Sequence, residues 1–253
     1  MPPLYGAAAR HHAIIATGMR PRLRALVACA VLAASVPATA DDFTVLSTVT
    51  SPRGGTRALI QYVSPARIRI SDGDRDAILE VPSGRVVLFS DRRREYWETS
   101  LDDIAAFVGQ LDAALARGET MEPMRASISV LKGPGRRKIA GYDTEQYTLS
   151  HGDAIRVEVW VAPAVPAPPS YFEARKVLYA TLGPMGRRFA RVFDEMKTLK
   201  GFPLAMSVDY RMRTSNRQTV TEATEVKRDP IPETAFAVPA GYAKAASPFV
   251  RRE

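Results

Sequence analysis

The chain has 253 residues, and its 35 Lys and Arg against 27 Asp and Glu give a formal net charge of +8. A hydrophobic fraction of 46% is that of a folded protein and excludes a disordered or collagen-like chain. A single cysteine, Cys29, excludes a disulfide scaffold and a Cys-based zinc site. The basic balance would indicate a nucleic-acid or lipid-surface partner if every charge belonged to the working protein.

The first forty residues have the pattern of an export signal. Three arginines in residues 20–24 precede an apolar stretch over residues 25–36, and a small-x-small site follows that ends at Ala40. We expect translation to start at Met19 and cleavage to follow Ala40, which leaves residues 1–40 as the leader. The apolar stretch is too short for a stable membrane span, so the mature protein should have none.

Two alternatives to this leader stay open. The apolar stretch could be an N-terminal core helix, although the basic, apolar and small-residue regions occur in the order of a signal peptide. The segment that ends at Cys29 also looks like a lipoprotein cleavage box, which would make the chain an outer-membrane lipoprotein. Four apolar residues between Arg24 and Cys29 are too few for the apolar region of such a signal.

Removal of the leader changes the composition. Four arginines and no acidic residue leave with it, so 31 basic residues against 27 acidic ones give a mature charge of +4. The mature chain has no cysteine and one histidine, His151. We therefore predict a periplasmic monomer without a nucleic-acid partner, with one domain over residues 41–245 and a tail over residues 246–253.

Apolar periodicity and turn residues predict an α+β protein dominated by antiparallel strands. Strands are expected at residues 57–63, 66–70, 77–81, 85–89, 96–98, 126–131, 138–140, 145–149, 155–162, 204–212 and 219–226. Helices are expected at residues 100–117, with Ser100 and Asp103 as a capping box, at 171–182, capped by Ser170, and at 185–199. Gly133, Pro134 and Gly135 are read as a turn, and Gly183 with Pro184 as the end of the second helix.

Motifs for catalysis are absent from the sequence. There is no Gly-x-Ser-x-Gly elbow, phosphate loop, dinucleotide fingerprint or His-Glu-x-x-His. His151 lies in a short polar run read as a solvated hairpin turn, so a catalytic base there is the weaker interpretation. The acidic run from Asp72 to Asp76 lacks the glycine and glutamate of a calcium loop. The sequence predicts no catalytic residue, no metal site and no cofactor.

Several short segments together resemble the LolA-like superfamily of lipoprotein-carrier proteins, and most closely an uncharacterised exported branch of it. They are residues 138–142, the strand around Trp160, residues 201–204, and residues 231–242 with Pro239 and Tyr242. The resemblance implies a long curved antiparallel sheet, an incomplete β-barrel, with helices packed on its concave side. In such proteins the concave face holds acyl chains, or the domain serves as a sensor or scaffold.

We therefore expect a non-enzymatic periplasmic protein that binds a lipid, a lipoprotein acyl chain or another hydrophobic ligand on its concave face. An envelope module for protein–protein contact or sensing is the alternative, and a hydrolase would need clustered carboxylates for which no spacing signal exists. The expected ligand-binding residues are apolar or aromatic side chains of the third helix and the final hairpin: Phe189, Phe193, Met196, Met206, Tyr210 and Met212.

Overall fold

A computed structural model describes residues 42–52, 55–73, 76–116, 127–180, 183–212 and 215–249. The expected leader, residues 1–40, and the last residues of the expected tail lie outside the described residues. Every described residue belongs to one compact unit. None of the described helices is long and apolar enough to cross a membrane.

Strands occupy most of the described chain, and three α-helices interrupt them. The first half of the chain contains β1 (Phe43–Ser51), β2 (Gly55–Val63), β3 (Arg67–Ser71), β4 (Asp76–Glu80), β5 (Arg85–Ser90), β6 (Glu95–Ser100) and α1 (Leu101–Ala116). The second half contains β7 (Ile128–Ile139), β8 (Tyr142–His151), β9 (Ile155–Ala162), α2 (Pro169–Ala180), α3 (Gly183–Met196), β10 (Phe202–Met212), β11 (Ser215–Lys227), the short 3-10 helix η2 (Glu233–Phe236) and β12 (Ala243–Lys244).

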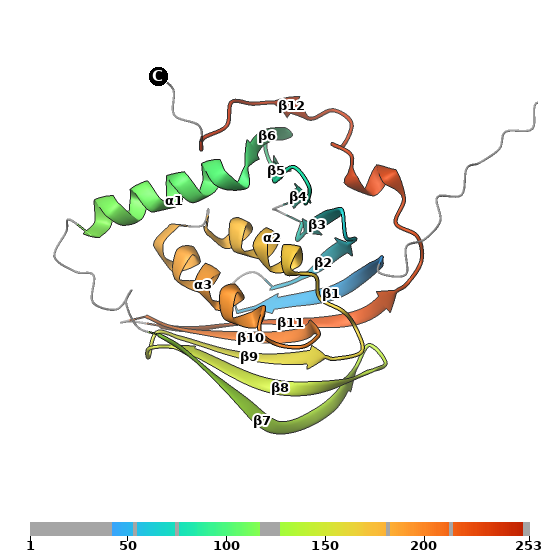
Figure 1. Cartoon of the computed structure of the whole chain (residues 1–253), viewed down its shortest axis with the longest axis vertical. Helices are drawn as coiled ribbons and strands as arrows, with labels where there is room; N and C mark the ends of the chain where they lie inside the picture. The colour runs from blue at the N-terminus through green and yellow to red at the C-terminus, as the bar shows by residue number, and fades with distance from the viewer. Residues whose placement is uncertain are drawn as a thin grey trace, which may run out of the picture. The chain divides into compact units, whose positions relative to one another are not determined.

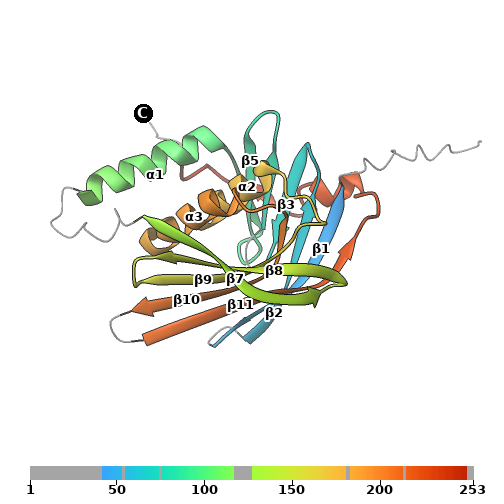
Figure 2. The same ribbon diagram turned by 60° about the horizontal axis from the view of Figure 1, so that its bottom comes forward.

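Within the described residues, the strands form one twelve-stranded sheet in the order β12-β6-β5-β4-β3-β2-β1-β11-β10-β9-β8-β7. All neighbours are antiparallel except β12, which pairs with β6 in parallel. The sheet bends around α2 and α3, while α1 lies apart from them near β6 (Figures 1 and 2). The predicted fold class is confirmed: an α+β fold with a long, curved, unclosed sheet and helices on its concave side.

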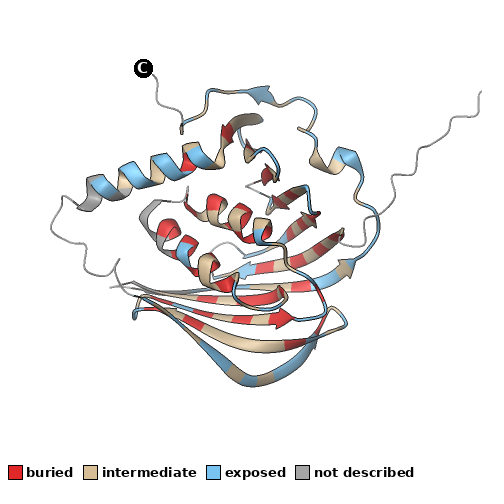
Figure 3. Cartoon of the chain, viewed as in Figure 1, coloured by how far each residue is buried: buried red, intermediate tan, exposed pale blue. Residues whose placement is uncertain are grey.

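Alternating side chains build the core on the concave side of the sheet. In β9, Ile155, Val157, Val159 and Val161 are each at most 1% exposed, while the residues between them are more accessible. This period of two is what a half-buried strand requires. Buried faces of α2 and α3 cover these side chains, whereas α1 is mostly exposed (Figure 3).

The sequence reading missed β1, the strand that joins the two halves of the sheet. β1 pairs with β2 on one side and with β11 on the other. Phe43, Val45 and Val49 point inward and are at most 4% exposed, but Ser47 occupies the inward position between them. That polar residue interrupts the apolar alternation by which a strand is recognised.

The turn predicted at Gly133, Pro134 and Gly135 is wrong, because β7 runs through these residues as an irregular edge strand. Proline is tolerated on an edge, where no neighbouring strand needs its missing N–H. The glycines leave room for Gln146 of β8, since a Cβ at Gly135 would lie 2.5 Å from Gln146 Oε1. Instead, the Gly135 N–H donates to that oxygen at 3.2 Å.

The helix starts agree with the sequence in one case and differ in two. At α1, the Asp103 N–H donates to Ser100 Oγ at 3.0 Å and the Ser100 N–H donates to Asp103 Oδ2 at 3.2 Å, which confirms the capping box. The cap predicted at Ser170 is wrong, since α2 begins one residue earlier at Pro169, whose fixed φ suits the first helical position. Gly183 and Pro184 begin α3 and do not end α2.

The C-terminal segment covers the outer face of the sheet over β4 and β5. Ile78, Val87 and Phe89 point away from the main core and are at most 5% exposed, because Phe236, Val238 and Tyr242 pack on them. Polar contacts fasten this segment: Arg67 Nη1 donates to Glu233 Oε2 at 2.7 Å, and Arg69 Nη1 donates to the Ala235 carbonyl at 2.8 Å. Both faces of these strands are therefore buried.

Replacing Phe236 with alanine should lower the free energy of unfolding by about 1–2 kcal/mol, because the ring is partly buried against Tyr62 and Arg67. Urea denaturation followed by circular dichroism would measure this. Leu131→Ala is the control: that side chain is 66% exposed, and the change should stay within about 0.5 kcal/mol. An unchanged midpoint for Phe236→Ala would mean that the segment is not part of the cooperative fold.

Candidate functional site

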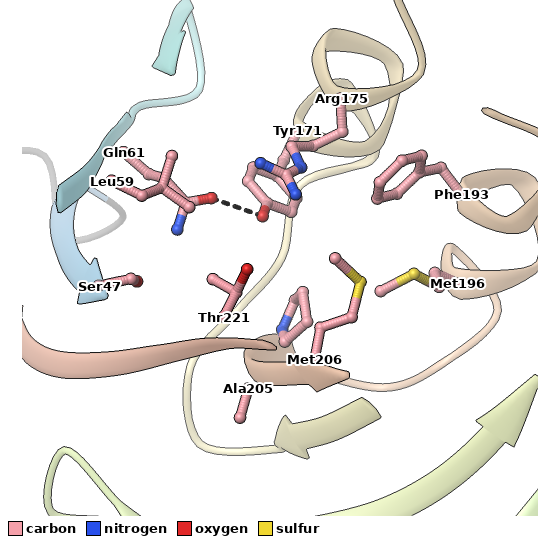
Figure 4. Close-up of a pocket in the computed structure, with 11 residues that line it drawn as sticks. Ser47, Leu59, Gln61, Tyr171, Arg175, Phe193, Met196, Ala205, Met206 and Thr221 are labelled. Atoms are coloured by element: carbon pink, nitrogen blue, oxygen red, sulfur yellow. Dashed lines mark hydrogen bonds between the residues drawn. The ribbon is translucent and has the colours of Figure 1, made fainter. Parts of the chain in front are cut away.

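A pocket lies between the helix pair α2–α3 and the concave face of the sheet, where β1, β2, β10 and β11 come together. Its lining residues are Ser47, Leu59, Gln61, Tyr171, Arg175, Phe193, Met196, Pro203, Ala205, Met206 and Thr221 (Figure 4). Its volume is about 20 Å³, which is room for about one water molecule. The helices thus fill most of the concave face in this conformation.

The structure brings together three of the expected ligand-binding side chains. Phe193 and Met196 of α3 face Met206 of β10 across the pocket. Phe189 and Tyr210 pack against each other beside the pocket, with ring centroids 5.9 Å apart, and do not line it. Met212 ends β10, and its side chain lies outside what the structure describes.

A hydrogen bond crosses the pocket from helix to sheet. Tyr171 of α2 donates its hydroxyl proton to Gln61 Oε1 of β2 at 2.7 Å, and both residues are at most 3% exposed. Burial raises the pKa of Tyr171 to about 12, so the hydroxyl keeps its proton as a donor at neutral pH. Because Gln61 Oε1 is the acceptor, its amide N–H groups remain as donors toward the pocket.

Arg175 places a full positive charge in the same pocket. The residue is 6% exposed, and its guanidinium extends from α2 toward the pocket (Figure 4). Arginine stays protonated in proteins. Its Nε has no hydrogen-bond partner, although nearly all buried polar atoms have one.

Aromatic rings and a carboxylate that is not in contact stabilise the charge of Arg175. Its guanidinium carbon lies 5.3 Å from the ring centroid of Tyr179 and 5.4 Å from that of Phe193, which are cation–π distances. Asp72 attracts the guanidinium through space, but it forms its ion pair with Arg57 at 3.5 Å. A desolvated cation–π contact contributes about 2 kcal/mol or more, and the desolvation of a buried ion costs several kcal/mol.

Sequence reasoning missed Arg175, Tyr171 and the polar residues of the sheet that face them. The signal was present, since a basic residue one helical turn after Tyr171 lies on the buried face of α2. A charge on such a face is more informative than another apolar residue there. Ser47 and Gln61 are likewise polar residues at inward positions of their strands.

Ion pairs join α2 and α3 to each other. Lys176 Nζ of α2 lies 2.8 Å from Asp194 Oδ1 of α3, and Lys197 after α3 pairs with Glu173 of α2. In contrast, the side-chain hydrogen bond that links the pair to the sheet within this pocket is the one from Tyr171 to Gln61. These ion pairs therefore join the helices to one another, and the Tyr171–Gln61 hydrogen bond joins α2 to β2.

The residues that the sequence offered as a catalytic base or a calcium loop are buried or form ion pairs in the structure. His151 is 2% exposed at the end of β8, so its interpretation as a solvated turn residue is wrong: the side chain points inward from the last strand position. Asp76 forms an ion pair with Arg69, as Asp72 does with Arg57. Among the described residues, no group of three or more His, Cys, Asp and Glu could hold a metal ion.

A second hollow lies on the outer side of β1 and β2, with a volume of about 410 Å³. It is wide open, and its lining includes Leu46, Thr48, Ala58, Ile60 and Thr224. The charged residue in this lining is Arg57, which forms an ion pair with Asp72. The enclosed pocket on the concave side is therefore the better candidate for a binding site.

Residues 101–242 match the profile of the family described as "Domain of unknown function (DUF4412)", which is more than half of the chain. The chain belongs to the DUF4412 family. This agrees with the expected likeness to a branch without an assigned function. A search of curated protein sequences gives no match.

Solved structures similar to this DUF4412 protein share little sequence with it. An uncharacterised conserved protein from Thermus thermophilus has 7% identity and a TM-score of 0.45, with 82% of this chain and 91% of that chain covered. PNGF-II has 13% identity and a TM-score of 0.41, with 82% of this chain but 32% of that chain covered, so this chain spans about a third of it. The LolA superfamily protein NE2245 from Nitrosomonas europaea has 9% identity and a TM-score of 0.26, with 78% and 90% covered. The superfamily that the sequence resembles is thus among those found.

Replacing Arg175 with methionine should leave the ligand-free protein at least as stable as the wild type. Methionine keeps the unbranched apolar stem of the side chain and removes a buried guanidinium whose Nε has no hydrogen-bond partner. Thermal unfolding of the two proteins without ligand would measure the difference. The control is Arg156→Met, which removes an exposed charge from β9 and should change little. A loss above about 2 kcal/mol at Arg175 alone would assign the guanidinium a structural role.

Proposed function

We propose that this protein is a non-enzymatic carrier or binding protein that holds a hydrophobic ligand between the concave face of its sheet and the helix pair α2–α3. The observation that carries the proposal is the pocket at this boundary, where Phe193, Met196 and Met206 meet. The thioethers of Met196 and Met206 adapt to irregular apolar shapes more readily than branched side chains do.

The ligand would enter by a movement of the helix pair. A pocket of about 20 Å³ is far below the roughly 300–1,000 Å³ of small-molecule sites, so the described conformation is the closed one. The ion pairs within the helix pair support its movement as a unit, since lifting it off the sheet breaks no α2–α3 contact. Each ligand methylene that leaves water for the opened pocket gains about 0.8 kcal/mol, which offsets the exposure of helix side chains on opening.

We place this function in the periplasm. The proposal rests on the leader expected at residues 1–40, with a mature domain over residues 41–245 and a tail over residues 246–253. The proposed binding function uses no cofactor. Attachment through Cys29 would put the same domain on the outer membrane.

Native mass spectrometry would test the proposal, with the mature protein purified without detergent from the cell envelope of the organism that produces it. We expect adducts with the masses of lipids or acyl compounds, and binding of the uncharged hydrophobic dye N-phenyl-1-naphthylamine with lipid as competitor. Absence of both the adducts and dye binding would refute it.

Tyr171→Phe should speed the entry of the dye. The variant removes the hydrogen bond to Gln61 and leaves a buried acceptor unsatisfied, which costs about 1–3 kcal/mol in the closed form only. If binding requires opening, the association rate constant should rise roughly tenfold. Stopped-flow fluorescence would measure it, with Tyr62→Phe on the outer face of β2 as the control. Equal rates for all three proteins would place the dye outside this pocket.

A protein-contact module is the second candidate, and the edge strand β7 favours it. Among the described strands, β7 is the last of the sheet and has no neighbour on its outer side, and its Leu131 is 66% exposed. Such an edge can accept a strand from another protein. A photo-crosslinking residue at position 131 in living cells would identify a defined partner, while a position on the exposed face of α1, such as Gln110, is the control.

A further inference from the structure

The pocket beneath α2 contains a buried cation with no carboxylate bound to it. Arg175 is more than nine-tenths buried, its Nε has no hydrogen-bond partner, and its guanidinium extends toward the pocket. Of the eleven lining residues, none is an aspartate or a glutamate. A buried charge is normally paired, so this arrangement lacks an anion.

The polar groups that face Arg175 are suited to donating hydrogen bonds. Gln61 keeps its amide N–H groups free of the Tyr171 contact, because its oxygen is the atom that accepts from Tyr171. Ser47 of β1 and Thr221 of β11 add hydroxyl groups from the sheet side of the pocket. These donors come from three neighbouring strands on the sheet side of the pocket, and Gln61 and Thr221 lie nearer the guanidinium than Ser47 does (Figure 4).

We infer that Arg175 is an anion receptor and that the ligand is an amphiphile whose polar end is a carboxylate, with Gln61 and Thr221 as further donors. This inference rests on the proposed binding function and specifies its ligand class. The rest of the pocket, formed by Leu59, Phe193, Met196 and Met206, contacts the apolar chain.

Size and charge favour a carboxylate over a phosphate. A planar carboxylate with two oxygens requires less widening of this small pocket than a tetrahedral phosphate does. A guanidinium binds a carboxylate through two parallel N–H···O bonds. A phosphate monoester carries up to two negative charges and three free oxygens, while Arg175 is the sole basic side chain among the residues that line this described pocket.

Competitive displacement of N-phenyl-1-naphthylamine by two ligands of equal chain length would test the inference. Hexadecanoate carries the carboxylate and hexadecan-1-ol does not, and the uncharged dye adds no charge of its own. The wild type should bind hexadecanoate roughly tenfold or more tightly than the alcohol, as a charge-assisted pair in a desolvated pocket predicts. In Arg175→Met this preference should vanish.

Arg156→Met is the matched control, since it removes the same charge from an exposed position on β9 and should retain the preference. Arg175→Lys keeps the charge without the two parallel bonds and should retain part of it. Circular dichroism and thermal unfolding of each variant establish that the comparison is made on folded protein.

The outcomes separate the two proposals. Equal affinity for acid and alcohol in the wild type would overturn the carboxylate inference and leave hydrophobic binding intact. Failure of both to displace the dye, combined with a thermal shift by millimolar acetate that Arg175→Met abolishes, would support the anion receptor and refute the carrier function. Failure of both ligands without an acetate effect would overturn both. A preference that survives in Arg175→Met would assign the carboxylate to another residue.

Discussion

An antiparallel sheet that curves without closing leaves a concave apolar face that its own strands cannot cover. The remainder of the structure follows from this constraint. Buried residues of α2 and α3 fill the concavity, and a short C-terminal segment covers the opposite side of β4 and β5. Because the cover is a separate helical layer, the core of the protein is also a boundary between two layers, each with its own internal hydrogen bonds or ion pairs.

This boundary contains the feature that a purely structural core would lack. A packed core of this size gains nothing from an unpaired guanidinium, and replacement of Arg175 by an apolar residue would be the simpler solution. The cation–π contacts with Tyr179 and Phe193 stabilise the charge but leave Nε without a hydrogen-bond partner. A buried charge in an otherwise apolar core, such as Arg175, indicates a functional position.

The sequence predicts the strand-rich fold well where alternation is strong, as in β9 and β10, and where a cap is local, as at Ser100. The prediction from sequence fails where residues far apart in the chain determine the local structure. β1 was missed because Ser47, which faces the pocket, interrupts its apolar pattern. Gly135 read as a turn because the side chain that occupies the space above it, Gln146, belongs to another strand.

The same reasoning applies to the site. Aromatic and methionine side chains on amphipathic elements led to Phe193, Met196 and Met206, which the fold does bring together. The polar half of the pocket was missed, since Gln61 and Arg175 are far apart in the chain and acquire meaning only when α2 lies on β2. Periodicity shows which face of a helix is buried, but it does not show what that face meets.

Tyr171 and Arg175 stand one turn apart on α2, so the hydrogen bond to the sheet and the buried charge respond to the same movement. Lifting α2 breaks the Tyr171–Gln61 bond and uncovers apolar surface, which favours closure. It also returns Arg175 toward water, which favours opening because the desolvation cost falls. Without an anion these opposing terms leave the closed form less stable than its apolar contacts alone would make it. A carboxylate carried in by an apolar chain would pair with Arg175 and remove this penalty in the liganded form, which favours capture of a charged amphiphile.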